Sequence, residues 1–370
     1  MRTNHHLRTM AAGAAVVALA LSACGGRDDS SSGSGSSGSG GAGGFSKSSV
    51  IGVSLPQKTS ENWVLAENLF KTDLGKAGYK PQVQFANGGV TEQQNQISAM
   101  VTNGAKVIVV GAIDGSQLTT QIKQAHDAGA VVIAYDRLLL NSPNVDYYVA
   151  YDNFKVGVLQ GQALLDGMKA KKPNGPYNIE LFAGSPDDAN AKVFFDGAMS
   201  VLKPKIDDGT LKVVSGQKSF NQAVTQGWKP ENAQKRMDTL LTGSYGGSKT
   251  LDGVLSPNDT LARAILTSTK SAGKPNPVVT GQDSEVESVK SIMAGVQYST
   301  INKDTRNLVK QAVKMVGDLQ AGKKPETNDT KSYNNGVKVV PAYLLPPQIV
   351  TKQNAKEAYA NDPTLSKVTG

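Results

Sequence analysis

The sequence predicts an α/β protein built from two lobes, each a doubly wound parallel sheet. From residue 48 onward, short apolar runs of strand length alternate with helical patterns, which is typical of parallel sheets covered by helices on both faces. Nine or more such strands exceed the usual size of one compact sheet. The chain has 370 residues, enough for one large domain or two ordinary ones. Because no Pro/Gly-rich linker separates the halves, we expect short crossings between them.

Five strands and three helices are expected in the first half of the globular region. The strands are 48–55, 81–86, 105–113, 130–137 and 145–153. Most of them are apolar runs bounded by polar or turn residues, as expected of strands buried on both faces. Apolar residues at helical spacing place helices at 62–78, 92–103 and about 118–125, and Gly78 provides a stop for the first helix.

The same alternation continues in the second half. A helix at about 156–164 precedes further strands with helical stretches between them, and these strands are 177–184, 211–217, 251–258 and 277–283. The strongest helical stripe of the chain lies between Leu308 and Leu319. By contrast, 338–350 is punctuated by proline and is interpreted as a strand plus a loop.

Residues 1–23 have the pattern of a secretion signal. A basic start with Arg2 and Arg8 precedes a 14-residue apolar core, Met10 to Ala23, which is too short to span a bilayer. A short buried helix is the alternative interpretation. No later segment approaches 18 apolar residues, so no other membrane span is expected.

Cys24 is the only cysteine, which excludes an internal disulfide. It ends the stretch "LSAC", which resembles a bacterial lipobox, and such a cysteine becomes lipidated after cleavage just before it. A free thiol is the alternative. Residues 24–47 are then the lipidated cysteine and a flexible tether, because 30–44 is Gly and Ser with a single Ala. These features predict an extracytoplasmic protein that is lipid-anchored to the cell membrane.

Charge and motif content restrict the classes of function. The formal net charge is +8, or +6 without Arg2 and Arg8, and no run of five or six basic residues occurs, so nucleic-acid binding is not expected. After removal of the signal, His126 is the only histidine, and HExxH, CxxC and GxSxG motifs are absent from the sequence. We therefore expect no enzyme, no metal site and no cofactor. The acidic stretch "SPDD" keeps a glycoside-active enzyme as an alternative.

Polar side chains follow the expected strands in both halves, at the point where each strand ends. In open parallel α/β sheets, ligands bind beyond the carboxyl ends of the strands. Taken singly, each residue also fits a helix N-cap or turn, Asp114 and Asp188 most of all, and Asp136 with Arg137 also fits a surface ion pair. The residues are Asp114, Asp136, Arg137, Asp187, Asp188, Asn190, Asn258, Asp259, Gln282, Asp283, Asn302 and Lys303.

Their recurrence favours a binding site over scattered caps. Carboxylates accept hydrogen bonds from hydroxyl groups, Arg and Lys donate to oxygen, and amides do both, which suits a ligand dense in hydroxyls. A phosphate is not indicated, because no Gly-rich phosphate loop follows a strand. Trp63 and Trp228, the only tryptophans, lie near expected strand ends or helix starts, where an indole face stacks on a pyranose; packing of a helix on a sheet is the alternative.

Longer stretches carry a specific resemblance. "VIAYDR", "NIELFAGSPDDANA", "LSPND", "TGQDSEVESVKSIMAG" and "QYSTINKDTR" are among those that resemble the substrate-binding proteins of bacterial sugar ABC transporters, in the xylose-binding and multiple-monosaccharide-binding branch. The resemblance covers nearly all of 48–350. It implies a type I periplasmic-binding-protein fold with three crossings between the lobes, the first near Asp152 and the second near Thr300. The N-terminal lobe would then comprise 48–152 and 300–320, and the C-terminal lobe and tail 153–299 and 321–370.

The resemblance also implies which residues contact a sugar. They are Asp114, Asp136 and Arg137 in the first lobe, Asn190, Asn258, Asp259 and Asp283 in the second, Lys303 at a crossing, and Trp63 and Trp228 as stacking aromatics. Relatives often carry an Arg just before the first Trp, where this chain has Asn62, and Lys58 is the candidate substitute donor.

The expected function is therefore capture of an aldose of the xylose, glucose or galactose type by a monomer, which delivers it to a membrane permease. Three alternatives stay open. They are a tethered binder of another small hydroxylated ligand, such as a furanosyl signalling molecule, a sugar-sensing partner of a receptor without transport, and the glycoside-active enzyme.

Overall fold

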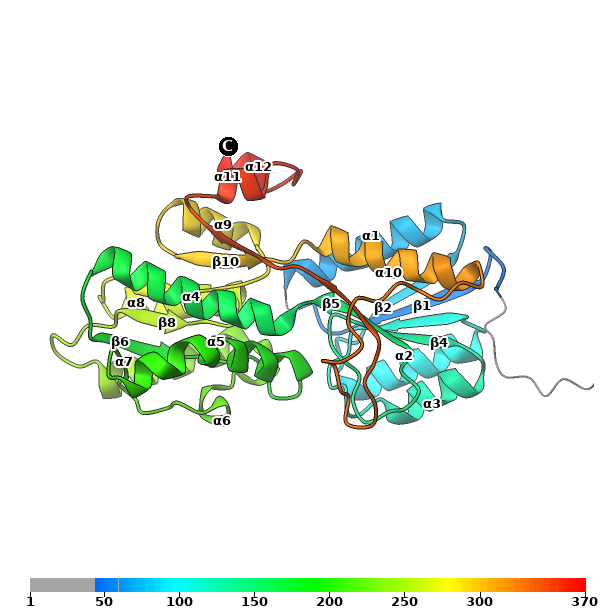
Figure 1. The fold of residues 1–370 in the computed structure, drawn as a ribbon, viewed down its shortest axis with the longest axis horizontal. Coiled ribbons are helices and arrows are strands. Elements are labelled where there is room, and N and C mark those ends of the chain that lie inside the picture. The colour runs from blue at the N-terminus through cyan, green and yellow to red at the C-terminus, as the bar shows by residue number, and fades with distance from the viewer. Residues whose placement is uncertain (1–43, 59) are drawn as a thin grey trace, which may run out of the picture. The chain divides into compact units, whose positions relative to one another are not determined.

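A computed structural model describes residues 44–58 and 60–370 of the chain. The predicted secretion signal, Cys24 and nearly all of the predicted tether lie outside the described residues. The described part forms two lobes, each centred on a parallel sheet with helices on both faces (Figure 1). The alternation of strands and helices along the sequence predicted this architecture.

The first lobe contains a six-stranded parallel sheet in the order β11-β5-β4-β3-β1-β2. Its strands are β1 (Val50–Leu55), β2 (Lys80–Phe85), β3 (Val107–Val110), β4 (Val131–Tyr135), β5 (Tyr147–Tyr151) and β11 (Ala342–Leu345). Alternate residues of β3 face opposite sides: Val107 and Val109 join one core cluster, and Ile108 and Val110 the other. Because both faces are buried, the strands are apolar throughout rather than alternating with polar residues.

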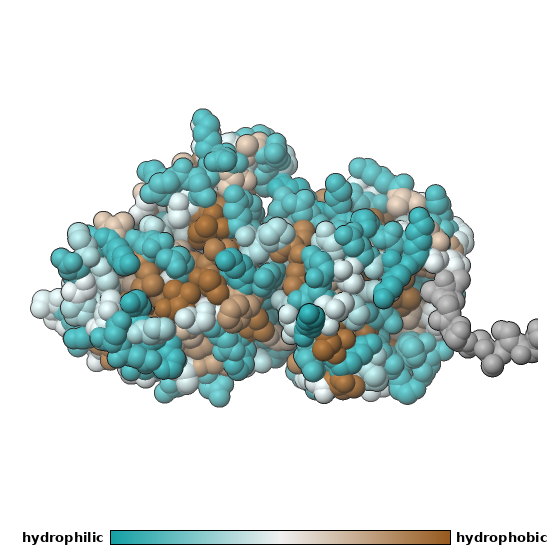
Figure 2. All heavy atoms as spheres, viewed as in Figure 1, coloured by the Kyte–Doolittle hydropathy of each residue, from teal (hydrophilic) through white to brown (hydrophobic). Residues whose placement is uncertain are grey.

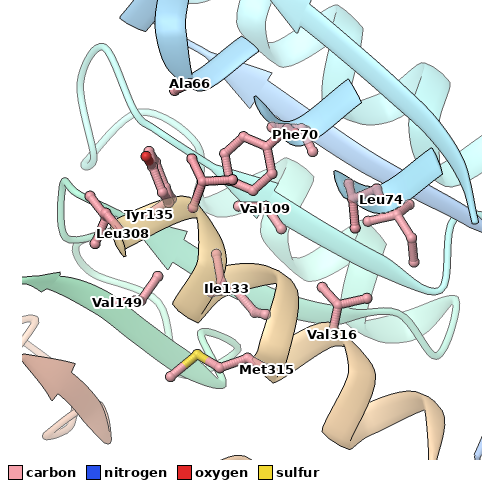
Figure 3. Packing of buried hydrophobic residues seen from close by; sticks show 14 of the residues in the cluster. Ala66, Phe70, Leu74, Val109, Ile133, Tyr135, Val149, Leu308, Met315 and Val316 are labelled. Carbon is pink, nitrogen blue, oxygen red and sulfur yellow. The ribbon is translucent and has the colours of Figure 1, made fainter. Parts of the chain in front are cut away.

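Four helices cover this sheet, two on each face. They are α1 (Glu61–Lys76), α2 (Val90–Thr102), α3 (Thr119–Asp127) and α10 (Thr305–Gln320). Figure 3 shows Phe70 and Leu74 of α1 beside Met315 and Val316 of α10, packed over the strand residues Val109 and Ile133. The apolar stripe of 308–319 is the face that α10 buries here. The helices α2 and α3 cover the other face, through residues such as Met100 and Ile122.

The second lobe contains a four-stranded parallel sheet in the order β7-β6-β8-β9. Its strands are β6 (Tyr177–Leu181), β7 (Leu211–Val213), β8 (Gly253–Leu255) and β9 (Val278–Val279). One face packs on α4 (Asn153–Lys171) and α5 (Ala189–Asp207), and the other on α7 (Pro230–Ser244) and α8 (Asp259–Ser271). Three shorter helical segments are α6 (Phe220–Ala223), η1 (Gln226–Trp228) and α9 (Val286–Met293).

The chain crosses between the lobes three times. It passes from β5 to α4 at Asp152, from β10 (Ser299–Asn302) to α10 at 303–304, and from β11 to β12 (Gln348–Thr351) at Pro346 and Pro347. Two adjacent prolines suit such a crossing, because neither can donate to a sheet. In the second lobe, β12 pairs antiparallel with β10.

One predicted boundary is corrected by this topology. The sequence interpretation assigned all of 321–370 to the C-terminal lobe, but β11 pairs in parallel with β5 and completes the first sheet. The reason is that the edge of β5 exposes backbone hydrogen-bonding groups, and the apolar strand 342–345 satisfies them. Only the segment after Pro347 lies on the second lobe, where α11 (Ala355–Ala358) and α12 (Ser366–Thr369) pack beside α9.

The visible face of both lobes is mainly hydrophilic, with hydrophobic side chains between the polar ones (Figure 2). Among the described residues, none of the helices combines the length and the apolar character needed to cross a membrane. His126 is exposed on α3.

Candidate functional site

A cavity lies between the two lobes, at the carboxyl ends of their strands. It encloses about 420 Å³ of empty space, counted out to its open mouth. The side chains around it are Ser60, Asn62, Trp63, Asp136, Arg137, Asp188, Asn190, Phe194, Trp228, Asn258, Gln282, Asp283 and Lys303.

Asp136 and Arg137 follow β4, and the backbone turns sharply there. Asp136 has φ of 61°, in the left-handed region that a non-glycine residue rarely adopts. Its carbonyl oxygen accepts from the Tyr148 hydroxyl (2.7 Å) and from the Asn190 side-chain amide of the other lobe (2.8 Å). The turn ends the buried strand and places both charged side chains at the cavity.

Arg137 connects the lobes by a buried ion pair. Its Nε lies 3.0 Å from Asp188 Oδ2, and one terminal nitrogen donates to the Ala112 carbonyl (3.0 Å). Its guanidinium also lies 5.3 Å from the centre of the Trp63 ring. Asp188 caps α5 by accepting from the Asn190 backbone amide (2.9 Å) and accepts from the Trp228 indole N–H (3.1 Å). Burial raises the pKa of Asp188, although Arg137 acts to lower it.

Lys303 carries the second positive charge, at the crossing between β10 and α10. Its Nζ lies 3.1 Å from Asp283 Oδ1 of the second lobe and 4.0 Å from Asp136 Oδ2 of the first. The lysine is almost completely buried. Burial favours the neutral amine, but Asp283 and Asp136 outweigh this effect and raise the pKa of Lys303. The side chain is therefore a permanent donor between two carboxylates at neutral pH.

Three further polar side chains of the second lobe face the cavity. Asn258 uses Oδ1 to accept from the Leu261 backbone amide (2.9 Å), so its amide nitrogen is the group left to donate. Asp283 has φ of 93°, again in the left-handed region. Gln282 is buried, and within the described residues its Oε1 has no hydrogen-bond partner. A buried acceptor without a partner is costly, and a donor on a ligand would satisfy it.

The two tryptophans form apolar walls. Trp63 comes from α1 and packs edge-on against Tyr135, with ring centres 6.2 Å apart. Trp228 has φ of 54° and packs so closely against Gly184 that a Cβ atom there would overlap the indole. A side chain larger than hydrogen at 184 would displace Trp228. An aromatic wall beside hydrogen-bonding groups suits a ligand with both C–H faces and hydroxyls.

The structure brings eight of the eleven predicted ligand contacts to this cavity. They are Trp63, Asp136, Arg137, Asn190, Trp228, Asn258, Asp283 and Lys303. Lys58 instead lies 3.6 Å from Glu67 and over the Phe85 ring. Asp114 is occupied by the turn it stabilises, because it accepts from Ser116 and Gln117. These two residues therefore differ from the expectation that they face a ligand.

Asp259 differs for another reason. It is 0% exposed and lies behind the cavity wall, where it accepts from Gln297 Nε2 (2.8 Å), Thr300 Oγ1 (2.9 Å) and the Glu285 backbone amide (3.0 Å). Burial, followed by the nearby Glu285, raises the pKa of Asp259 well above its usual range. The sequence pattern placed it correctly at a strand end but could not distinguish the exposed side of that end from the buried side.

Sequence reasoning did not assign five residues of the cavity wall. They are Ser60, Asn62, Asp188, Phe194 and Gln282. Asp188 and Gln282 were visible as polar residues at strand ends. Asn62 was noted only as a departure from the resemblance, yet it lines the cavity itself. Phe194 gave no signal in the sequence, because its spacing on α5 is that of an ordinary core residue.

Taken together, the site offers three carboxylates, two cations, amides and aromatic faces around a small space. Such a set binds a neutral, hydroxyl-rich molecule, because each hydroxyl can donate to a carboxylate and accept from a cation or amide. Within the described residues, no group of three or more His, Cys, Asp or Glu side chains is arranged to hold a metal ion.

Comparison with known proteins gives a consistent result. A family model described as a periplasmic binding protein domain matches residues 51–324. The multiple sugar-binding periplasmic receptor ChvE of Rhizobium radiobacter is 52% identical, over 82% of this chain and 87% of the receptor. The D-xylose-binding periplasmic protein of Escherichia coli is 36% identical, over 86% of this chain and 91% of that protein.

A solved structure extends the comparison to the fold. It is an ABC transporter solute binding protein from Clostridium phytofermentans with bound β-D-glucose, and it has 39% sequence identity and a TM-score of 0.83. The match covers 87% of this chain and all of that one.

Proposed function

The chain belongs to the periplasmic binding protein family, and from that premise we propose that it captures one aldose between its lobes as the extracytoplasmic binding component of an ABC sugar importer. The observation that carries the proposal is the pairing of charges across the cavity. Asp136 and Arg137 come from one lobe, Asp188 and Asp283 from the other, and Lys303 lies at a crossing between them. The relatives named for multiple sugars and D-xylose, and the glucose-bound structure, support a monosaccharide ligand of the xylose or glucose type.

The proposed mechanism is capture by closure of two lobes, with no bond made or broken in the sugar. Hydroxyls contact one lobe first, and the second lobe then folds over the sugar. Hydrogen bonds to charged groups stabilise by about 1.5–3 kcal/mol each, and neutral ones by about 0.5–1.5 kcal/mol. About eight such bonds exceed the roughly 8 kcal/mol of micromolar affinity, and the cost of association and lobe ordering removes the excess. We expect dissociation constants in the micromolar range or below.

A thermal-shift panel of pentoses, hexoses and uronic acids, followed by calorimetry on the best ligands, tests this proposal. An aldose should raise the melting temperature and bind with one site per chain. If no aldose binds while another hydroxylated compound does, the site is real but the sugar class is wrong. Incubation with aryl-glycosides should give no product, and turnover would instead favour the enzyme alternative.

Two partners belong to the same proposal. A membrane permease would receive the sugar from the closed form, and a lipid on Cys24 would hold the protein at the membrane. The evidence for the lipid anchor is the "LSAC" stretch and the apolar residues before it. Labelling of cells with an alkyne fatty acid should mark the wild type but not a Cys24→Ala variant. Equal labelling of both would contradict the lipid anchor.

A further inference from the structure

The loop 281–285 is a tightly constrained part of the cavity wall. It carries Gln282 and Asp283, and two consecutive non-glycine residues, Asp283 and Ser284, have φ of 93° and 55°. Residues hold such conformations only where the surrounding structure fixes them. The groups that fix this loop therefore determine where the Asp283 carboxylate points.

One of those groups is Asp259, which holds the loop from inside the second lobe. Its Oδ2 accepts from the Glu285 backbone amide (3.0 Å) and from Thr300 Oγ1 (2.9 Å). The Thr300 hydroxyl oxygen in turn accepts from the Ser284 backbone amide (3.3 Å). These bonds restrain the backbone on the carboxyl side of Asp283.

Backbone bonds to Ile301 also hold the loop, from the Asp283 amide (3.0 Å) and to the Gly281 carbonyl (3.2 Å). A further group comes from the tail segment, residues 352–370. The hydroxyls of Tyr359 and Ser284 are 2.6 Å apart, and Tyr359 is 1% exposed. Its ring packs in a small core with Val289 of α9, Val350 of β12 and Leu365. Among the described residues, the Ser284 hydroxyl hydrogen-bonds only to Tyr359, which lies 75 positions later in the chain.

The same tail segment also contacts the crossing that carries Lys303. Asp362 pairs with Arg306 in the first turn of α10, three residues after Lys303, and Arg306 pairs with Asp304 at the helix cap (2.9 Å). The tail segment thus touches both sides of the Lys303–Asp283 ion pair, at the loop through Tyr359 and at the crossing through Asp362. Neither residue lines the cavity.

We propose that Tyr359 is a positioning residue of the sugar site, which fixes the loop 281–285 through Ser284 and so holds the Asp283 carboxylate against Lys303. The proposal rests on the proposed sugar-binding function. It makes the tail segment part of the binding site, although no residue of that segment lines the cavity.

The test compares two Tyr→Phe variants of the full chain. Tyr359→Phe removes the bond to Ser284 and keeps the ring. Tyr245→Phe is the matched control, because Tyr245 is equally buried in the same lobe and donates to Glu180 Oε1 (2.9 Å), far in the chain from the loop. Calorimetry and stopped-flow fluorescence with D-glucose and D-xylose give the affinity and the two rate constants. Tyr359→Phe should weaken binding roughly three- to tenfold, the equivalent of one neutral hydrogen bond, mainly through faster dissociation.

The control should bind sugar within about twofold of the wild type, although it should lose at least as much thermal stability as Tyr359→Phe, because its lost bond is to a carboxylate. Ser284→Ala removes the other partner of the same bond. It should reproduce the effect, and the double variant should be no weaker than the single ones. Unchanged affinity in Tyr359→Phe, or equal weakening in both Tyr→Phe variants, overturns the inference. A wild type that binds neither sugar contradicts the proposed function itself, which is a different result.

Discussion

Asp188→Asn separates sugar affinity from folding stability, because Asp188 has two roles that the substitution affects differently. As the N-cap of α5 it accepts from the Asn190 backbone amide, and asparagine is an equally good N-cap. Its second role is to pair with Arg137 through Oδ2, and the same oxygen accepts a hydrogen bond from the Trp228 indole N–H. An asparagine has one acceptor oxygen instead of two, so Arg137 or the cap loses its partner.

The size of the effect follows from burial. Arg137 is 11% exposed and Asp188 is 3% exposed. Breaking a buried pair by removing one partner costs about 3–5 kcal/mol, because the other charge stays buried without compensation. Here the partners lie on different lobes, so separation of the lobes returns Arg137 to water. We therefore expect the substitution to make lobe closure less favourable by about 3 kcal/mol, which weakens sugar affinity about a hundredfold. This value is at the lower end of the range because Arg137 retains its hydrogen bond to the Ala112 carbonyl.

Calorimetry with D-glucose and D-xylose measures the affinity, and urea unfolding without sugar measures the stability. Asp187→Asn is the control, because it removes the same charge from the neighbouring position, where the side chain's only hydrogen bond within the described residues is from Gln226 Nε2 (3.4 Å). The control should change affinity less than threefold. Equal affinities of wild type and Asp188→Asn, or a loss of affinity matched by a loss of unfolding free energy, would refute this reasoning.

Three other variants test separate parts of the site. Asp136→Asn should weaken sugar binding by about 10- to 100-fold in calorimetry, since a hydrogen bond to a charged group is worth about 1.5–3 kcal/mol. Asp114→Asn is the control, because Asp114 lies outside the cavity, and it should leave sugar binding unchanged. Equal effects of the two variants would argue against the site. Gly184→Ala should displace Trp228, weaken binding and cost about 1–3 kcal/mol of unfolding free energy, and a neutral result in both assays would contradict the packing. Asp259 has a raised pKa when folded, so the native state binds more protons than the unfolded chain above about pH 4, and stability is lost as pH rises toward that raised pKa. Urea unfolding at pH 5 and pH 8 should therefore show the wild type losing stability relative to Asp259→Asn, and a pH-independent difference between the two would be inconsistent with the raised pKa.

Much of the fold was predictable because its signals are local. Apolar runs such as 107–110 and the stripe of α10 report burial directly, and these elements could be placed from their own residues. The position of β11 was not predictable in this way. Its place in the first sheet depends on the unpaired edge of β5, nearly 200 residues earlier in the chain, and no local pattern records that pairing.

The candidate site was also predictable only in the part that depends on local sequence patterns. The polar residues at strand ends indicated the cavity, because parallel strands bring their carboxyl ends together. Which side of a strand end faces the cavity depends on single backbone angles, such as the positive φ of Asp136 and Asp283. Asp259 shows the limit: it follows a strand like the others, but its side chain turns inward and holds the loop of Asp283.

A crystal structure of the protein grown with D-glucose or D-xylose tests the central claim most directly. We predict one sugar between the lobes, with hydroxyls bonded to Asp136 and Arg137 on one side and to Asn258 and Asp283 on the other. Well-ordered sugar bound elsewhere, or bound to one lobe while these four side chains face separate surroundings, would contradict the account.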